Sequence, residues 1–380
     1  MQAVDLDTLP VVGVVDRERT PDGGVVFRRS PAWARAQVVD PMQDAVLSMP
    51  AGARLELATT SRAIELDVHL TSYGVADAPL TMPAFDLVID DELRASRTIR
   101  HDWSTPQPIN KRVKAFAATT PITVRFDELP GDPHAVVEIW LPHTASMELL
   151  AVRIDDGATI GPLHRDRRRW IHYGSSISHC MTAPTPTATW PAITATRAGV
   201  DLLNLGVSGS CMLDQHVART IRDSRADLIS LKVGINVVDG DAMRERTFVP
   251  SLHGFLDTVR EGHPTTPLLV TTPIICPVLE DTPGPVVNRD GIVQAVARPD
   301  PELNEGALTV RRVRELVQAA IAARRPTDPH LHGLDGLRLF GPDDVADLPD
   351  GVHPNPKGSR RIGERFHALA FGAGAPFGPA

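Results

Sequence analysis

A serine, a histidine and an aspartate, the residue types that carry nucleophilic acyl transfer, stand out in the second half of this chain. Ser176 follows an apolar run over residues 170–173 and a glycine at position 174. An apolar run that ends in Gly-Ser-Ser is typical of a strand that stops at a tight turn, where a hydroxyl stays exposed. Such a hydroxyl becomes a nucleophile when a base takes its proton.

The histidine best suited to be this base is His353, near the C-terminus. Asp350 lies three residues before it. In a tight turn this spacing lets the carboxylate reach Nδ1, where it holds the tautomer and stabilises the imidazolium. We therefore predict Ser176, Asp350 and His353 as the catalytic residues.

Acyl transfer also needs hydrogen-bond donors for the oxyanion of the tetrahedral intermediate. The backbone N–H groups of Ser176 and Gly209 and the side-chain amide of Asn236 are the candidates. Gly209 and Asn236 each follow an apolar run that reads as a buried strand, at residues 200–205 and 228–233. Since ligands of parallel sheets bind at the carboxyl ends of the strands, we predict an oxyanion hole made by Ser176, Gly209 and Asn236.

Strands and helices alternate from residue 170 onward, which favours an α/β fold with a parallel sheet and helices on both faces. The alternation has the following predicted elements: helices at 191–198, 216–224, 248–261, 307–324 and 360–370, and further strands at 267–272 and 330–340.

Four short blocks of this half resemble those of the SGNH (GDSL-type) hydrolases, in the family's order. They are residues 174–177, 204–209, 234–236 and 350–353. The resemblance covers about residues 170–371 and implies a flavodoxin-like three-layer α/β/α domain. It also implies Ser176 as nucleophile, Gly209 and Asn236 as oxyanion donors, and Asp350 with His353 completing the triad.

Two positions depart from the family pattern. The aspartate that usually precedes the nucleophile is Ser175, and the aspartate that usually follows the third-block asparagine is Val237. Neither position transfers protons, so the prediction of an enzyme stands, but both weaken inferences about substrate. Ser175 and Ser178 are also common helix-capping residues.

Other nucleophiles are less well supported. Ser178 lies further from the turn glycine, and its presence breaks the Gly-x-Ser-x-Gly elbow of α/β-hydrolases. Cys180 is the sharper alternative, yet no basic or helical surroundings can be argued for it. The histidines at 172, 179 and 216 are interpreted as packing or surface residues, and His332 has no assigned role.

Residues 1–155 read as an all-β, jelly-roll-like sandwich, because short alternating runs are separated by turn clusters. A sandwich before a domain of this type is similar to a two-domain subgroup that includes carbohydrate esterases. A structural role is favoured over a carbohydrate-binding or substrate-shaping one, since no aromatic platform is visible.

A linker, the catalytic domain and one long loop complete the predicted organisation. Residues 156–169 are a polar linker with a basic cluster, for which a solvated role is preferred to phosphate binding, and residues 170–380 form the catalytic domain. Residues 277–303 form a long loop rich in Pro, Asp and Gly, which is a lid, an acceptor-binding loop or a disordered insertion.

Composition excludes several function classes. The 380 residues are 42% hydrophobic with a formal net charge of −8 and no long basic run, which argues against nucleic-acid binding. The N-terminus does not read as a signal peptide, and no apolar run approaches the roughly 20 residues of a membrane span. We expect a cytoplasmic protein whose three cysteines are reduced, with no metal and no cofactor.

The function that these predictions favour is a serine esterase that cleaves small O-acyl esters through an acyl-Ser176 intermediate. The alternative is an O-acyltransferase that moves the acyl group to an alcohol on a sugar or natural-product scaffold. A non-catalytic binding protein that retains the fold is the third possibility. The partners are a small acyl ester and, for the transferase, an alcohol acceptor.

Overall fold

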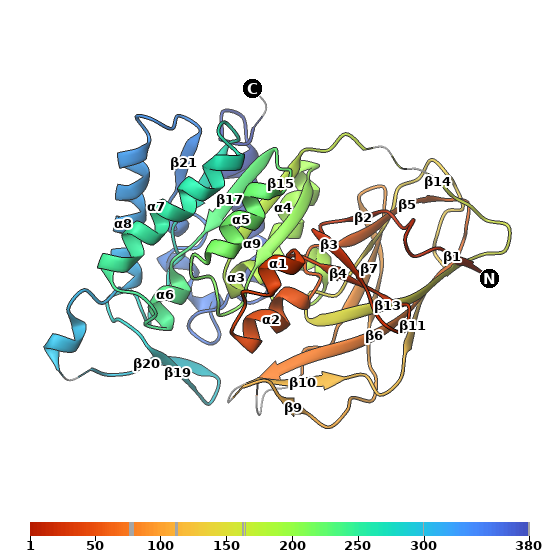
Figure 1. The fold of residues 1–380 in the computed structure, drawn as a ribbon, viewed down its shortest axis with the longest axis horizontal. Coiled ribbons are helices and arrows are strands. Elements are labelled where there is room, and N and C mark those ends of the chain that lie inside the picture. The colour runs from red at the N-terminus through yellow and green to blue at the C-terminus, as the bar shows by residue number, and fades with distance from the viewer. Residues whose placement is uncertain (76–79, 111–112, 162, 164, 299, 379–380) are drawn as a thin grey trace. The chain divides into compact units, whose positions relative to one another are not determined.

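The structure is a computed structural model that describes residues 1–75, 80–110, 113–161, 163, 165–298 and 300–378 (Figure 1). Contacts divide the chain into two compact units. The first contains residues 1–167, 184–188 and 201–204, and the second contains 168–183, 189–200 and 205–380. The domain boundaries derived from the sequence stay a prediction. No helix within the described ranges is both long and apolar enough to cross a membrane.

The first unit contains two antiparallel sheets. The larger, eight-stranded sheet runs β3-β4-β13-β6-β10-β9, with β1 beside β13 and β11 beside β6. Its strands are β1 (Gln2–Val4), β3 (Asp16–Arg19), β4 (Val25–Arg28), β6 (Ile64–Val75), β9 (Gln107–Pro108), β10 (Val113–Ala117), β11 (Ile122–Phe126) and β13 (Ala145–Ile154).

The smaller, six-stranded sheet runs β14-β5-β12-β7-β8, with β2 beside β5. Its strands are β2 (Val11–Val12), β5 (Arg54–Thr59), β7 (Ala84–Ile89), β8 (Glu92–Thr98), β12 (Val137–Trp140) and β14 (Ile160–Gly161). The alternating runs of the sequence thus correspond to real strands, and their apolar positions join one buried core.

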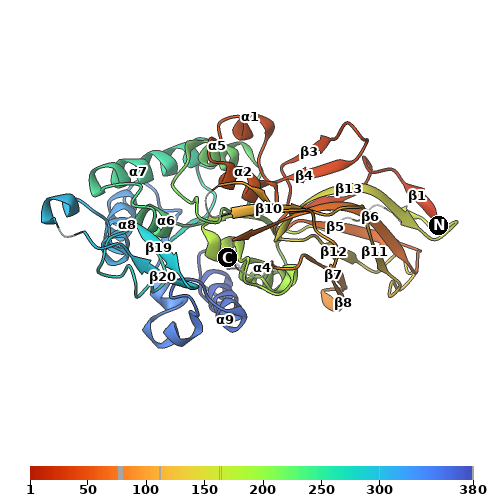
Figure 2. The same ribbon diagram turned by 90° about the horizontal axis from the view of Figure 1, so that it is seen from below.

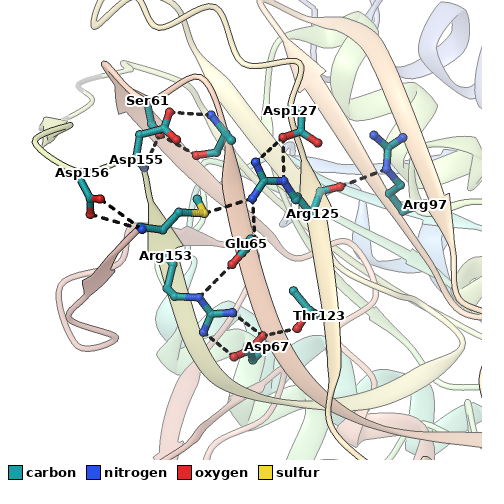
Figure 3. Close-up of polar contacts among 12 residues, drawn as sticks. Ser61, Glu65, Asp67, Arg97, Thr123, Arg125, Asp127, Arg153, Asp155 and Asp156 are labelled. Carbon is teal, nitrogen blue, oxygen red and sulfur yellow. Dashed lines mark hydrogen bonds and ion pairs between the residues drawn. The ribbon is translucent and has the colours of Figure 1, made fainter.

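The outer face of β6 shows why the alternation is so regular. Leu66 is buried in the core, while its neighbours Glu65 and Asp67 point to the opposite face. There Arg153 of β13 pairs with both carboxylates, and Arg125 of β11 pairs with Glu65 (Figure 3). Opposite charges on adjacent strands support this register, although water screens such partly exposed pairs and each contributes little to stability.

Two short helices interrupt this β unit, and the alternating pattern did not predict them. They are α1 (Ala32–Arg35) and α2 (Pro41–Ser48). Proline occupies the first turn of α2, and the side chain of Asp40 accepts a hydrogen bond from the Met42 N–H. Both are standard signals of a helix start, so an eight-residue helix forms within an otherwise β-rich sequence.

Two arginines of the basic cluster in the predicted linker form ion pairs, whereas Arg168 and Arg169 are exposed. Arg165 and Arg167 both pair with Glu138 and Asp91, and their side chains are only 19% and 10% exposed. Glu138 and Asp91 therefore neutralise the positive charges that phosphate binding would require. Pro162 and His164 of this linker lie outside the described residues.

The second unit is built on β15, β17, β18 and β21 of a five-stranded sheet in the order β16-β15-β17-β18-β21, in which residues 201–204 of β16 are grouped with the first unit. The strands are β15 (Arg169–Gly174), β16 (Asp201–Gly206), β17 (Leu228–Lys232), β18 (Leu268–Thr271) and β21 (Leu331–Leu334). The pairs β15–β17, β17–β18 and β18–β21 are parallel. In sequence order this is 2-1-3-4-5, the flavodoxin-like arrangement, so the predicted fold class is confirmed.

Helices cover both faces of this sheet. They are α3 (Ser176–His179), α4 (Trp190–Ala198), α5 (Gln215–Asp223), α6 (Ile235–Asp239), α7 (Glu245–Gly262), α8 (Val310–Arg324) and α9 (Pro356–Phe366). On one face Trp170 packs against Trp190 of α4 and Phe366 of α9. On the other face Tyr173 stacks on Phe255 of α7. Figures 1 and 2 show α4 beside α9 and α5 beside α7.

Two features of this unit differ from the sequence expectation. The last strand ends at Leu334 rather than near 340, because the side chain of Asp335 accepts a hydrogen bond from Leu337 N–H and begins a 3₁₀ turn at Gly336–Arg338. The long loop at 277–303 contains a hairpin of β19 (Val286–Arg289) and β20 (Ile292–Ala295). Pro299 of this loop lies outside the described residues.

Candidate active site

Ser176 is the first residue of α3, immediately beyond the end of the central strand β15. Gly174 makes this turn possible, because a Cβ there would lie 2.2 Å from the Ser178 Oγ. Ser175 is the N-cap, and its side chain accepts a hydrogen bond from the Ile177 N–H at 3.4 Å. The indole N–H of Trp190 donates to the Ile177 carbonyl at 2.8 Å and anchors the turn to α4. Ser176 itself stays half-buried.

Asp350 and His353 form a local turn, the acid–base loop (residues 350–353). One carboxylate oxygen of Asp350 accepts hydrogen bonds from the backbone N–H groups of Val352 and His353, at 2.9 and 2.7 Å. The other lies 2.6 Å from His353 Nδ1. Burial opposes ionisation of Asp350, but the hydrogen bonds from His353 outweigh it and lower the pKa of Asp350 to about 2. The group is therefore a carboxylate at neutral pH.

The structure brings the three predicted catalytic side chains together. His353 Nε2 lies 2.8 Å from Ser176 Oγ. Because the carboxylate of Asp350 can only accept, Nδ1 carries the imidazole proton and Nε2 is left to accept from the serine hydroxyl. This is the arrangement in which a histidine acts as general base toward a serine.

Contacts outside the triad hold the two segments together. The Thr182 hydroxyl donates to the Pro354 carbonyl at 3.0 Å, and the Cys180 thiol lies 3.4 Å from the Ser359 hydroxyl of α9. Asn355 caps α9 by accepting from the Gly358 N–H. The segment that follows the acid–base loop, including α9, is therefore fixed to the turn that carries Ser176.

Two of the three predicted oxyanion donors have a free backbone N–H. Neither Ser176 N–H nor Gly209 N–H donates to any residue that the structure describes. The turn that carries Gly209 is tied to β15 by a hydrogen bond from Val207 N–H to the Gly174 carbonyl at 2.8 Å. A Cβ at Gly209 would meet no atom within 4 Å, so its surroundings are open to a ligand.

Asn236, the third predicted donor, is buried on α6 with its amide held from two sides. Its Oδ1 accepts from Cys211 N–H at 3.0 Å, and its Nδ2 donates to Asp239 Oδ2 at 3.0 Å. These contacts set the orientation of the amide and leave its second N–H hydrogen for a ligand. The Cys211 contact also joins Asn236 to the segment that carries Gly209.

The two departures from the family pattern have structural explanations. Ser175 supplies the cap of α3, which is the capping role proposed for it. Val237 is wholly buried in the core. Ser178 lies inside α3, and its hydroxyl is 2.8 Å from Nε2 of the buried His172. Burial raises the pKa of the Cys180 thiol, so this cysteine is an inert core residue.

Asp239 and Cys211 are the residues that sequence reasoning missed. Asp239 lies three residues after Asn236 on the same short helix, a spacing that places side chains on one face. That spacing was the available signal for Asp239. Nothing in the sequence pointed to the Cys211 backbone, because its contact with Asn236 spans 25 positions.

Comparison with known proteins gives the same family. Residues 167–276 match the model of the GDSL-like Lipase/Acylhydrolase family. No curated protein matches the chain. The salicylyl-acyltransferase SsfX3 from a tetracycline biosynthetic pathway is similar in structure, with a TM-score of 0.78 and 26% identity over 96% of this chain and 95% of that one.

Two other solved structures share the fold. A protein of Bacteroides ovatus ATCC 8483 assigned as a GDSL-like lipase has a TM-score of 0.65 and 18% identity over 96% of this chain and 95% of its own. A family two carbohydrate esterase from Cellvibrio japonicus has a TM-score of 0.53 and 12% identity over the same shares. The family and enzyme class predicted from the four blocks are thus confirmed: residues 167–276 carry a GDSL-like lipase/acylhydrolase domain, and the similar solved structures are esterases and an acyltransferase.

Proposed function

We propose that this protein is a serine esterase that cleaves small O-acyl esters through an acyl-Ser176 intermediate. The observation that carries the proposal is the relay from Ser176 Oγ to His353 Nε2 at 2.8 Å and from His353 Nδ1 to Asp350 at 2.6 Å. Proton transfer of this kind needs hydrogen-bond distances between each pair of groups.

The first half of the reaction forms the acyl-enzyme. Ser176 Oγ attacks the acyl carbonyl carbon while His353 Nε2 takes the hydroxyl proton. The negative charge that develops on the carbonyl oxygen is stabilised by the N–H groups of Ser176 and Gly209 and by the amide of Asn236. When the C–O bond to the alcohol breaks, His353 returns the proton to the leaving oxygen. Ionised Asp350 stabilises the imidazolium throughout.

The second half repeats the same proton transfers with water. His353 takes a proton from a water molecule, whose oxygen attacks the acyl carbon. The bond to Ser176 Oγ breaks, the serine regains its proton, and a carboxylic acid leaves. The same groups serve both halves, so no further residue is required.

A second candidate is an O-acyltransferase, in which an alcohol takes the place of water. It is supported by the likeness to the salicylyl-acyltransferase SsfX3, which extends over 96% of the chain. His353 would then take the proton of the acceptor hydroxyl, and the product would be a new ester. An acceptor on a sugar or natural-product scaffold fits this chemistry.

Intact-protein mass after brief exposure to an activated aryl acetate tests the shared intermediate. We expect one acetyl adduct and released phenol with the wild type and with Ser178→Ala, and neither with Ser176→Ala. An equal adduct on Ser176→Ala would overturn the role of Ser176. No adduct from the aryl acetate or from a fluorophosphonate probe would favour a non-catalytic binding protein.

Product analysis with alcohol acceptors separates the two candidates. The esterase predicts free acid at every acceptor concentration. The transferase predicts that ester product rises and free acid falls as acceptor is added. Ser176→Ala, which lacks the nucleophile, controls for uncatalysed transfer in both cases.

A further inference from the structure

The hairpin β19–β20 belongs to the long connection between β18 and α8, here called the insertion, whose described residues are 272–298 and 300–309. Its two-residue turn, Asp290-Gly291, has positive φ at both positions, as a type I′ hairpin requires. Ile292 is 46% exposed, whereas the next residue, Val293, is 9% exposed. One face of the hairpin is therefore packed against the unit and the other faces outward.

The packed side of the hairpin meets the acid–base loop. Val293 N–H donates to the carbonyl oxygen of Asp350 at 3.1 Å. Val293 pairs with Asn288 across the hairpin. In a two-residue hairpin this pair does not exchange hydrogen bonds, so its N–H points outward and is available to Asp350. Gly351 is packed from the same insertion, since a Cβ there would lie 3.2 Å from Val278.

The insertion is tied at its other side to α6, the helix that carries Asn236. Arg298, whose side chain is 10% exposed, pairs with Asp241 just beyond this helix and donates to the Gly284 carbonyl. Gly284 approaches α6 so closely that a Cβ would lie 2.1 Å from the Val238 carbonyl oxygen. In Figures 1 and 2 the hairpin lies next to α6.

These contacts place the insertion between the two halves of the catalytic machinery. The Val293 N–H holds Asp350, which orients His353. Arg298 holds the end of α6, the helix that carries Asn236. We propose that Val293 is a positioning residue, whose backbone N–H holds the Asp350 carbonyl, and that Arg298 braces the hairpin against α6. The inference rests on the proposed function for its kinetic consequence.

Val293→Pro and Val293→Ala are a matched pair for testing this role. Both substitutions replace the valine side chain, but only proline removes the backbone N–H. Proline fits here because the lost N–H takes no part in the hairpin ladder. We expect kcat for an aryl acetate to fall about tenfold in Val293→Pro relative to Val293→Ala, with KM within about twofold, since Asp350 loses its alignment.

A second readout does not require turnover. The proton between His353 Nδ1 and Asp350, joined at 2.6 Å, is expected to give a far-downfield proton NMR signal. This signal should broaden or move upfield in Val293→Pro and persist in Val293→Ala. Loss of stability alone would leave it in place in the folded fraction.

Arg298→Ala tests the brace without altering the backbone, and Asp290→Asn, which keeps the left-handed turn, is its control. Arg298→Ala is expected to lower kcat and weaken the downfield signal, and Asp290→Asn to change neither. The inference is overturned if folded Val293→Pro and Arg298→Ala match their controls in the NMR signal. A wild type that shows the signal but never forms an acyl adduct would instead count against the proposed function.

Discussion

His172 and His353 each link two side chains through both ring nitrogens. His172 joins the hydroxyls of Ser230 and Ser178, at 2.7 and 2.8 Å. His353 joins the carboxylate of Asp350 and the hydroxyl of Ser176, at 2.6 and 2.8 Å. The two serine partners are only two residues apart on one short helix, so the same segment supplies a hydroxyl to each histidine.

The two histidines differ in the partner of Nδ1 and in the solvent exposure of the ring. His172 is wholly buried, and burial, with a smaller repulsion from Lys232, lowers its pKa to about 3. It stays neutral and packs among aromatic rings. His353 is 32% exposed and faces a carboxylate that can stabilise its protonated form. We therefore expect a Ser–His contact to act as a catalytic pair only where a carboxylate faces the imidazole and a substrate can reach it.

The sharpest way to break this comparison is to remove each serine in turn. Ser176→Ala should lower ester turnover by about 10⁴-fold or more, because the nucleophile is lost. Ser178→Ala should leave turnover within about threefold and cost about 1–3 kcal/mol of stability, because a buried ring nitrogen loses its partner. Aryl acetate kinetics and chemical denaturation of both variants measure this. Comparable losses of turnover in the two variants would contradict the assignment.

Removing the carboxylate should make His353 resemble His172. Asp350→Asn is expected to lower kcat by about 10³- to 10⁴-fold, since an amide can present an N–H to Nδ1 and impose the wrong tautomer. The pKa of Asp350 is lowered to about 2, so its stabilising effect is present above pH 4 and is lost as the pH falls toward 2.

Chemical denaturation at several pH values measures the effect of Asp350 on the free energy of unfolding. The wild type should exceed Asp350→Asn by about 2 kcal/mol at neutral pH, and the difference should shrink below pH 4. A constant difference across that range would show that ionisation of Asp350 contributes nothing. Asp343→Asn, which alters an exposed carboxylate outside the triad, is a suitable control.

Lys232, like His172, is a titratable residue buried in the second unit. It lies beside Gly174 in register, is 2% exposed, and has its pKa lowered by burial to about 8. Charging it in the folded state is costly, so Lys232→Met should raise the free energy of unfolding at pH 7 by on the order of 3 kcal/mol. The gain should fade as the pH rises from about 8 to 10.5. A loss of stability at pH 7 would contradict this.

The smallest expected effect is the acid sensitivity that His172 confers. Below pH 6.5 the unfolded chain binds a proton at this residue that the folded protein, with a pKa of about 3, does not bind. The wild type should therefore lose on the order of 2 kcal/mol between pH 7.5 and 5 through this group. His172→Gln, which cannot titrate, should show a correspondingly flatter dependence. An equal pH dependence of stability in the wild type and in His172→Gln would contradict the prediction.

Local sequence signals predicted most of the elements that carry the site. The turn at Ser176 and the Asp350–His353 spacing depend on contacts within a few residues, so they could be read from the chain. Two local signals were not used. Asp290-Gly291 marked a hairpin inside the long loop, and Asp40-Pro41 marked the start of α2.

The sequence by itself determined the alternation of strands and helices, the turns that present Ser176 and His353, and the family. Only the tertiary structure decided that these two side chains, 177 positions apart, meet at 2.8 Å. It also decided that His172 is buried and that the Asn236 amide is shared between Cys211 and Asp239. Periodicity and turn chemistry act over a few residues, whereas these contacts depend on strand order and on how the helices pack across the sheet.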